Sequence, residues 1–344
     1  MNSPASDRDV EMMARVAALY YLEDMTQEKI ARTLGLSRPK VSRLLQRARS
    51  EKIVEITVHV DPALSARLEE RLVDEFRLRQ AFLVSDQLVE SAQRAAVAGA
   101  AAGYLARNLE DGVVVAVGMG RNVGAVPDQL VNPAMRPGSR FVSAIGGSPE
   151  VEAPVNPNDI SRRLAEQFGA KATGLYAPSY ARTTAEHDAF MRHRDVRATL
   201  QLARSARVAL VGIGDAREDS AVVKMGCFSA SEMDGLREAG AVGDILGTFF
   251  DIHGRPVADG MDSRVIALGG TDLRRIGEVL AVASERSKAS SLLGALRTGV
   301  VDVLFTSIAI ARQILATADK QAQSPPPARS EGKPKTKKKA SDRS

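Results

Sequence analysis

The sequence predicts an α/β protein with a small N-terminal helix-turn-helix unit and a larger, Rossmann-like α/β domain. Two observations lead to this expectation. Between residues 14 and 50, apolar residues recur at helical spacing in short stretches separated by turn residues. Further along, short runs rich in β-branched residues alternate with helical stretches, which is typical of a mostly parallel sheet covered on both faces. A chain of 344 residues with 44% hydrophobic content has room for one small and one large domain.

The N-terminal unit is expected over residues 8–60, beginning with a helix over residues 14–23. A second helix is predicted over residues 27–34, with Thr26 as its N-cap because a hydroxyl can accept a bond from the first free amides. Gly35 then supplies the left-handed residue that ends this helix.

A third helix follows at once. Ser37 is expected to cap it, and Pro39 lies in its first turn, where a missing N–H costs nothing. Helix, a short turn containing Gly, and a second helix form the helix-turn-helix pattern. After them, "KIVEITV" (residues 52–58) alternates like a half-buried strand.

The large domain is expected over residues 65–318. Five runs predict buried strands: "GVVVAVGMG" (112–120), "FVSAI" (141–145), "VALVGIG" (208–214), "RVIAL" (264–268) and "VDVLFT" (301–306). Helices are predicted at 159–168 and 288–297. Ligands of parallel sheets bind outside the C-terminal ends of the strands, and several of these runs end there in Gly.

Charge is distributed unevenly along the chain. The net charge is +5, yet residues 26–52 hold eight Lys and Arg against two Glu, a net +6. Residues 329–344 add another +5, so the rest of the chain is mildly acidic. A basic module attached to an acidic body favours a polyanionic partner at one end. The Pro-, Ser- and Lys-rich tail, residues 319–344, has no apolar periodicity and is expected to be disordered.

Other features exclude several classes of protein. The sequence has no apolar run long enough to cross a membrane and no signal segment at its start, so we expect a cytoplasmic location and no membrane partner. One cysteine, Cys227, excludes a disulfide framework, and four scattered histidines lack metal-ligand spacing. No metal and no cofactor are expected.

The polar face of the third helix carries the side chains suited to base edges and phosphates in a major groove. Base contacts are predicted for Arg38, Lys40, Ser42 and Arg43, and backbone contacts for Thr26, Gln27, Arg47 and Arg49, with Ser37 at the helix start. The alternative is a charged but inert surface of a helical hairpin. The concentration of cations favours double-stranded operator DNA.

The chain resembles the SorC family of bacterial sugar-binding transcriptional regulators from about residue 14 to residue 316. "LYYLEDMTQEKIARTLGLSRPKVSRLLQRAR" is similar to that family's helix-turn-helix, and "VAVGMGRNVGAV", "RVALVGIGD", "GAVGDILGTFFDIHGRPV" and "AVASERSKASSLLGALRTGVVDVLFT" follow in the order of its effector domain. The resemblance implies a regulator whose DNA binding responds to a sugar, a polyol or a sugar phosphate. It also implies the fold of sugar-phosphate isomerases and deaminases, and a homo-oligomer, dimer or tetramer.

Three Gly-rich loops at strand ends form the predicted effector site. The first, "GMGRN", can bring amides close to an anion at a helix start, although a plain strand–helix turn would use the same glycines. The resemblance implies a phosphate contact for this loop and for Lys288, and hydroxyl contacts for Asp244. The candidates are Gly118, Gly120, Arg121, Asn122, Gly146, Gly147, Gly214, Asp215, Asp244 and Lys288. Ile145 replaces an Arg of some phosphosugar-binding members, which favours a monophosphate, sugar or polyol over a bisphosphate.

Two rival functions remain at this stage. The implied fold also hosts isomerases and deaminases, so the chain could be such an enzyme with an appended DNA-binding module; fold alone does not decide function. It could also be an architectural DNA-binding protein without an effector. No acid–base pair emerges from the sequence, and a DNA-binding module suits a sensor better than a catalyst, so we expect a regulator and no enzyme.

Overall fold

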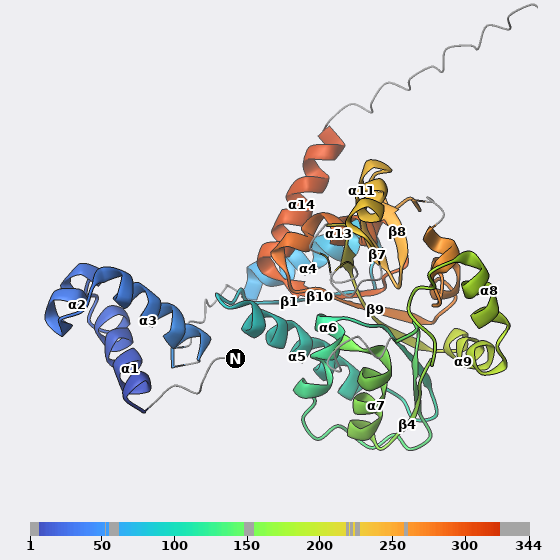
Figure 1. Cartoon of the computed structure of the whole chain (residues 1–344), viewed down its shortest axis with the longest axis horizontal. Helices are drawn as coiled ribbons and strands as arrows, with labels where there is room; N and C mark the ends of the chain where they lie inside the picture. The colour runs from blue at the N-terminus through green and yellow to red at the C-terminus, as the bar shows by residue number, and fades with distance from the viewer. Residues whose placement is uncertain are drawn as a thin grey trace, which may run out of the picture.

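The computed structural model of the chain describes residues 7–51, 53–54, 62–147, 155–217, 220, 223, 228–257 and 261–323. Cys227 and nearly all of the strand expected at 52–58 lie outside these residues, as does the tail from residue 324 onward. Figure 1 shows a three-helix unit at the N-terminus and a large α/β body.

The N-terminal unit consists of α1 (Asp7–Tyr21), α2 (Gln27–Leu34) and α3 (Arg38–Ser50). Its predicted caps are confirmed: Thr26 accepts a bond from the amide of Lys29 at 3.3 Å, and Ser37 accepts one from the amide of Lys40 at 3.4 Å. Gly35 has φ of 64°, the left-handed conformation that ends α2. The first helix begins at Asp7, seven residues before the predicted start; its first three residues are charged, although Met13 already belongs to the buried core of this unit.

Apolar side chains of the three helices form a separate small core. Its buried members are Met13, Val16, Ala17, Ile30, Ala31, Val41, Leu44, Leu45 and Ala48. They recur three or four residues apart, so each helix buries one stripe and leaves its polar face to solvent.

A seven-stranded sheet forms the centre of the body. Its strands lie in the order β1-β10-β9-β5-β2-β3-β4, and every neighbouring pair is parallel. The bounds are β1 Gln80–Val84, β2 Val114–Val117, β3 Arg140–Ser143, β4 Lys171–Thr173, β5 Val208–Gly212, β9 Glu278–Val282 and β10 Val303–Ser307. The mostly parallel sheet predicted from the alternating pattern is confirmed.

Helices cover both faces of this sheet (Figure 1). The longer ones are α4 Pro62–Phe76, α5 Glu90–Asn108, α7 Pro157–Phe168, α8 Thr184–Arg192, α9 Arg194–Arg204, α13 Ala289–Arg297 and α14 Ile308–Gln323, and the short ones are α6 Arg121–Gly124, η1 Pro127–Gln129, α12 Gly270–Leu273 and η4 Arg286–Lys288. Side chains of one strand alternate between the faces. Val115 and Val117 join the core beneath α5 and α7, whereas Ala116 joins the core on the opposite face.

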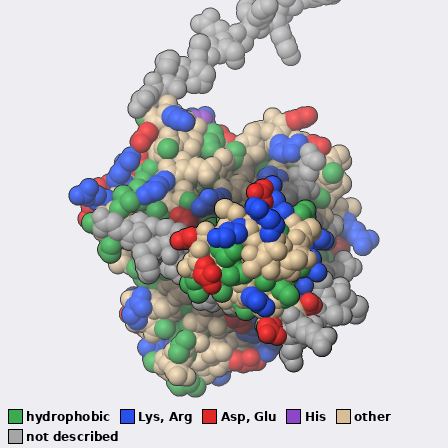
Figure 2. Space-filling model, turned by 90° about the vertical axis from the view of Figure 1, so that its left-hand side faces the viewer, with side chains coloured by type: hydrophobic (Ala, Val, Ile, Leu, Met, Phe, Trp, Pro, Cys, Tyr) green, Lys and Arg blue, Asp and Glu red, His purple; other side chains and the backbone are tan. Residues whose placement is uncertain are grey.

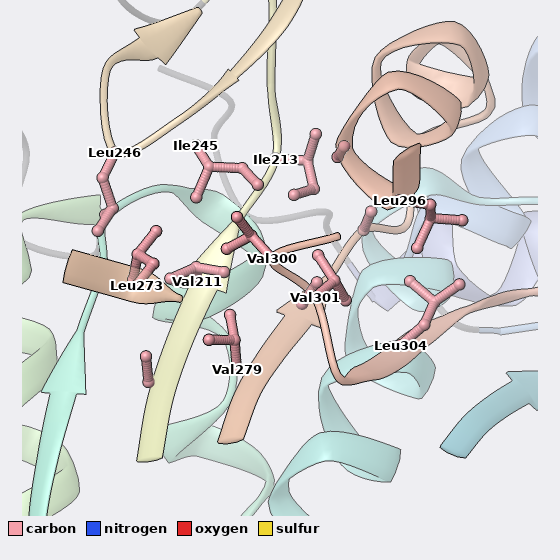
Figure 3. Close-up of a cluster of buried hydrophobic side chains, with 14 of the residues drawn as sticks. Val211, Ile213, Ile245, Leu246, Leu273, Val279, Leu296, Val300, Val301 and Leu304 are labelled. Atoms are coloured by element: carbon pink, nitrogen blue, oxygen red, sulfur yellow. The ribbon is translucent and has the colours of Figure 1, made fainter. Parts of the chain in front are cut away.

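The core on that opposite face extends to the loops at the strand ends. Figure 3 shows Val211 and Val279 from the sheet lying together with Leu296 and Val301, and Ile245 and Leu246 approaching them from a hairpin above. This packing holds the hairpin in place over the C-terminal edge of the sheet.

A second, antiparallel sheet is formed by β6 (Gly214–Asp215), β7 (Ala241–Ile245) and β8 (Thr248–Asp251), next to α11 (Ala230–Glu238). Strand β6 follows β5 after a single residue. The turn between β7 and β8 has two residues with positive φ, Leu246 at 51° and Gly247 at 80°, which is the turn that matches the twist of a hairpin.

Two expectations differ from the structure. The run at 264–268 is not a strand: η3 (Met261–Arg264) leads into it, and Val265 and Ala267 make only isolated bridges, to Tyr180 and Ile145. Its apolar character arises from the burial of Ile266 beneath the loops. In addition, α14 continues to Gln323, five residues past the predicted end of the body.

Within the described ranges, none of the helices combines the length and the apolar composition that a membrane span requires.

Candidate functional site

The outer face of α3 presents cations to solvent. Arg38, Lys40 and Arg43 are exposed, and Ser42 is partly exposed. Arg47 is half-exposed and forms an ion pair of 2.9 Å with Glu51 one turn later. Figure 2, in which the three-helix unit faces the viewer, shows Lys and Arg side chains on that unit with acidic ones among them.

The starts of α2 and α3 carry further predicted DNA contacts. Thr26 and Ser37 are exposed N-cap residues, and Gln27 opens α2. Free amides at helix starts and nearby hydroxyls are common partners of DNA phosphates. The structure therefore places the predicted base-contacting and phosphate-contacting side chains on one accessible unit.

A cavity of about 960 Å³ lies at the C-terminal ends of the parallel strands. Strand β2 pairs with β3 on one side and with β5 on the other, so the chain reverses its direction of winding here. Such a topological switch point is where open α/β sheets bind ligands. Seven of the ten predicted effector residues line the cavity: Gly120, Arg121, Asn122, Gly214, Asp215, Asp244 and Lys288.

The other three predicted residues, Gly118, Gly146 and Gly147, are not among the lining residues. Added side chains there would meet protein atoms: a Cβ at Gly118 would lie 3.1 Å from Leu246, and one at Gly146 would overlap the carbonyl of Pro178. One at Gly147 would lie 2.5 Å from the side-chain oxygen of Asn156. These glycines permit close packing behind the cavity.

The loop before α6 is less suited to an anion than the sequence suggested. Gly120 has φ of 107°, as a strand-to-helix turn requires, but its amide donates to the carbonyl of Val155 at 3.1 Å. The helix itself is a single turn, Arg121–Gly124. Its backbone therefore offers little of the dipole that a longer helix would provide.

Among the described residues, Glu285 is the most connected group in the cavity, and it was not among the site residues predicted from the sequence. Its carboxylate accepts a hydrogen bond of 2.8 Å from Asn122 and lies 3.7 Å from Nζ of Lys288 and 3.5 Å from Arg121. Only 6% of Glu285 is exposed. Its place in the sequence could have indicated this role, because Glu285 is a carboxylate three residues after the buried strand β9, at the edge of the sheet where ligands bind.

Neighbouring groups hold this carboxylate ionised. Burial by itself raises the pKa of Glu285, but Lys288, the bond from Asn122 and the guanidinium groups of Arg121 and Arg94 outweigh burial and lower the pKa below its ordinary value. Ser284 completes the arrangement by donating to Asn122 at 2.6 Å.

The pKa of Asp244 is shifted in the opposite direction, upward. Burial raises its pKa to about 6, and Asp215 adds to the rise, although the amide of Gly247 and the charge of Lys288 act against it. The amide of Gly247 donates to Asp244 at 2.9 Å. A carboxyl group that is protonated at mildly acidic pH can both donate to and accept from a hydroxyl group.

Lys288 connects the carboxylate of Glu285 to the sheet. Its Nζ donates to the backbone carbonyl of Ile213 at 2.8 Å, just after β5. Asp215, two residues further along, forms an ion pair with Arg217 at 3.4 Å. Asp215, Arg217, Glu285 and Lys288 thus each lie within 4 Å of a partner of opposite charge.

Residues 60–316 match the family described as "Putative sugar-binding domain", and residues 13–51 match region 4 of sigma-70. The full-length sorbitol operon regulator SorC of Klebsiella pneumoniae superposes with a TM-score of 0.69 at 29% identity, over 90% of this chain and all of that one. The chain belongs to the SorC family.

Other members are similar over comparable lengths. The sugar-binding domain of a transcriptional repressor from Vibrio fischeri is 45% identical, with a TM-score of 0.70 over 74% of this chain and all of that domain. The erythritol catabolism regulatory protein EryD of Brucella abortus is 29% identical over 90% of this chain and 98% of its own. These SorC-family relatives are transcriptional regulators, which supports a sugar-responsive regulator and argues against the enzyme alternative.

Proposed function

We propose that the chain binds double-stranded operator DNA through α3 and that a sugar, polyol or sugar phosphate in the cavity modulates this binding. The genes controlled would be those of carbohydrate catabolism. Arg38, Lys40, Ser42 and Arg43 would meet base edges, whereas Thr26, Gln27, Ser37 and Arg47 would hold the DNA backbone.

One observation carries the effector half of this proposal. The cavity at the switch point collects Asp215, Asp244 and Lys288 from three separate segments, at the edge of the sheet where α/β proteins bind small ligands. Buried carboxylates and an ammonium group that already face a cavity are suitable partners for hydroxyl groups.

Coupling between the two sites requires that the effector bind two arrangements of the protein with different affinity. We propose a homo-oligomer, a dimer or a tetramer, in which closure of the cavity changes the spacing between helix-turn-helix units. DNA and effector would then alter each other's affinity by the same factor, corresponding to about 1–3 kcal/mol.

The test is a DNA-binding titration with the segment upstream of the protein's own gene, at one salt concentration, with and without a panel of sugars, polyols and their phosphates. A shift of the curve by one compound supports the sensor. DNA binding that no compound shifts contradicts the sensor, and absence of DNA binding at moderate salt contradicts the operator half. An isomerase and deaminase assay of the same preparation tests the rejected enzyme alternative.

A further inference from the structure

The three polar side chains that the family resemblance assigns to a phosphate converge on a carboxylate of the protein. Asn122 donates to Glu285 at 2.8 Å, and Arg121 and Lys288 lie 3.5 and 3.7 Å from its oxygens. Glu285 is almost entirely buried. An internal anion therefore already stands where these residues would receive an external one.

The other cations around the cavity also have acidic partners. Arg121 lies 3.4 Å from Glu90 as well as near Glu285, and Arg217 lies 3.4 Å from Asp215. Arg286, which lines the cavity, lies 3.5 Å from Asp86, which does not. Each of the four cationic side chains that line the cavity, within the described residues, is thus within 4 Å of a carboxylate.

A phosphate would meet an unfavourable environment here. It would have to displace one carboxylate from its cations and then remain beside the buried carboxylates of Glu285 and Asp244. Removing an anion from water is costly unless cations and donors replace its hydration, and the cations of this cavity are already neutralised.

Hydroxyl groups match the same cavity well. Within the described residues, three lining side chains, each more than nine-tenths buried, hold an atom without a hydrogen-bond partner: Nε2 of Gln93, Oγ of Ser220, and Oε1 of Glu285, which has only ion-pair contacts of 3.5 Å to Arg121 and 3.9 Å to Arg94. They offer an amide donor, a hydroxyl and a carboxylate acceptor. A buried polar atom without a partner is costly, and a ligand that both donates and accepts would satisfy all three.

We infer that the effector is an uncharged, multiply hydroxylated molecule, a polyol or an unphosphorylated sugar, and that Glu285 excludes its phosphate esters. This inference rests on the proposed function of the cavity as the effector site. Within the cavity, the hydroxyl groups of the ligand donate to Glu285 and Asp244 and accept from Gln93 and Lys288.

The test is calorimetric titration of the full chain with erythritol, ribitol, sorbitol, mannitol, fructose and glucose, each beside its terminal phosphate monoester. We expect one uncharged compound to bind at least about 100-fold more tightly than its own phosphate, because like charges at a binding site cost several kcal/mol. In Glu285→Gln, which retains an oxygen for Asn122, that preference should fall by about tenfold or more.

The matched control is Glu166→Gln, which removes the same charge from an exposed position on α7 and should leave the preference unchanged. A wild-type protein that prefers a phosphate ester, or a folded Glu285→Gln variant with the wild-type preference, overturns the inference alone. Absence of binding by every compound, uncharged or phosphorylated, overturns the proposed effector function as well. The wild-type ratio decides the question even where the variant does not fold.

Discussion

Gly214 lies directly against Asp244, its partner across the antiparallel pair β6 and β7. A methyl group at position 214 would overlap the carboxylate of Asp244. The only residue that allows this approach is glycine, because any Cβ would occupy the same space. The backbone of β6 and the carboxylate of Asp244 therefore form one continuous wall of the cavity.

Gly214→Ala should consequently destabilise the protein by about 1–3 kcal/mol, the range for forcing an extra carbon into a packed site. It should also weaken the response to effector, because Asp244 must move to make room. Urea unfolding and the DNA titration with effector measure the two effects.

The control for this change is Gly235→Ala. Gly235 lies in α11, and a Cβ there would meet no atom within 4 Å. Alanine favours helix over glycine by about 1 kcal/mol, so this variant should be as stable as the wild type or more so. If Gly214→Ala unfolds at the wild-type urea concentration, the close approach to Asp244 does not constrain the fold.

Asp244→Asn should change how stability depends on pH. The folded pKa of about 6 lies above the ordinary value of 3.8, so the folded state binds more protons and the contribution of Asp244 to stability is fully present only below pH 4. This contribution is lost as the pH rises to 6, by on the order of 3 kcal/mol. The free energy of unfolding of the wild type should therefore fall relative to that of Asp244→Asn across this interval.

Urea unfolding of both proteins at several pH values between 4 and 7 measures this difference. Glu285 provides the comparison, because its pKa is lowered. Its stabilising contribution is present above its unfolded pKa and is lost as the pH falls through its folded pKa. Relative to Glu285→Gln, the wild type should lose stability on acidification. If both comparisons change in the same direction with pH, one of the two assignments is wrong.

Much of the fold could be predicted because local chemistry determined it. Thr26, Gly35 and Ser37 marked helix ends, since caps and left-handed turns depend on a few neighbouring atoms. The run at 264–268 misled the prediction because burial, and not sheet pairing, selects its apolar residues. Periodicity alone does not distinguish a buried strand from a buried loop.

The cavity was predictable only in part. Loops at strand ends were correctly expected to meet, because parallel strands end at one edge of the sheet. The role of Glu285 depends on Asn122, which is 163 residues away in sequence, and on Lys288 and Arg121. A charge network that long-range packing assembles leaves no periodic signal, and the glycines at 146 and 147 could not be distinguished from lining glycines without their neighbours.

Arg43→Ala should weaken specific DNA binding by roughly 1–3 kcal/mol and leave effector binding intact. Arg43 is exposed on α3, on the face that the small core leaves to solvent. Fluorescence anisotropy with specific and scrambled duplexes at one salt concentration measures the change. Arg197→Ala removes an exposed cation from α9 and serves as the control. An equal loss on both duplexes would assign Arg43 to the phosphate backbone and contradict a base contact.

Lys288→Ala should have the opposite effect to Arg43→Ala. It should abolish most of the effector response and leave DNA binding without effector intact. The variant loses a partly buried donor that faces the cavity and leaves Glu285 with fewer cations. Because hydrogen bonds to charged groups contribute about 1.5–3 kcal/mol, effector affinity should fall roughly 10- to 150-fold. Calorimetry with the bound compound and the DNA titration measure this loss, and a thermal melt confirms that the variant is folded.

Lys171→Ala, at an exposed position on β4, should respond as the wild type does. An unchanged response in Lys288→Ala would remove this lysine from the effector site, and the bond from Nζ to Ile213 would then serve the fold alone.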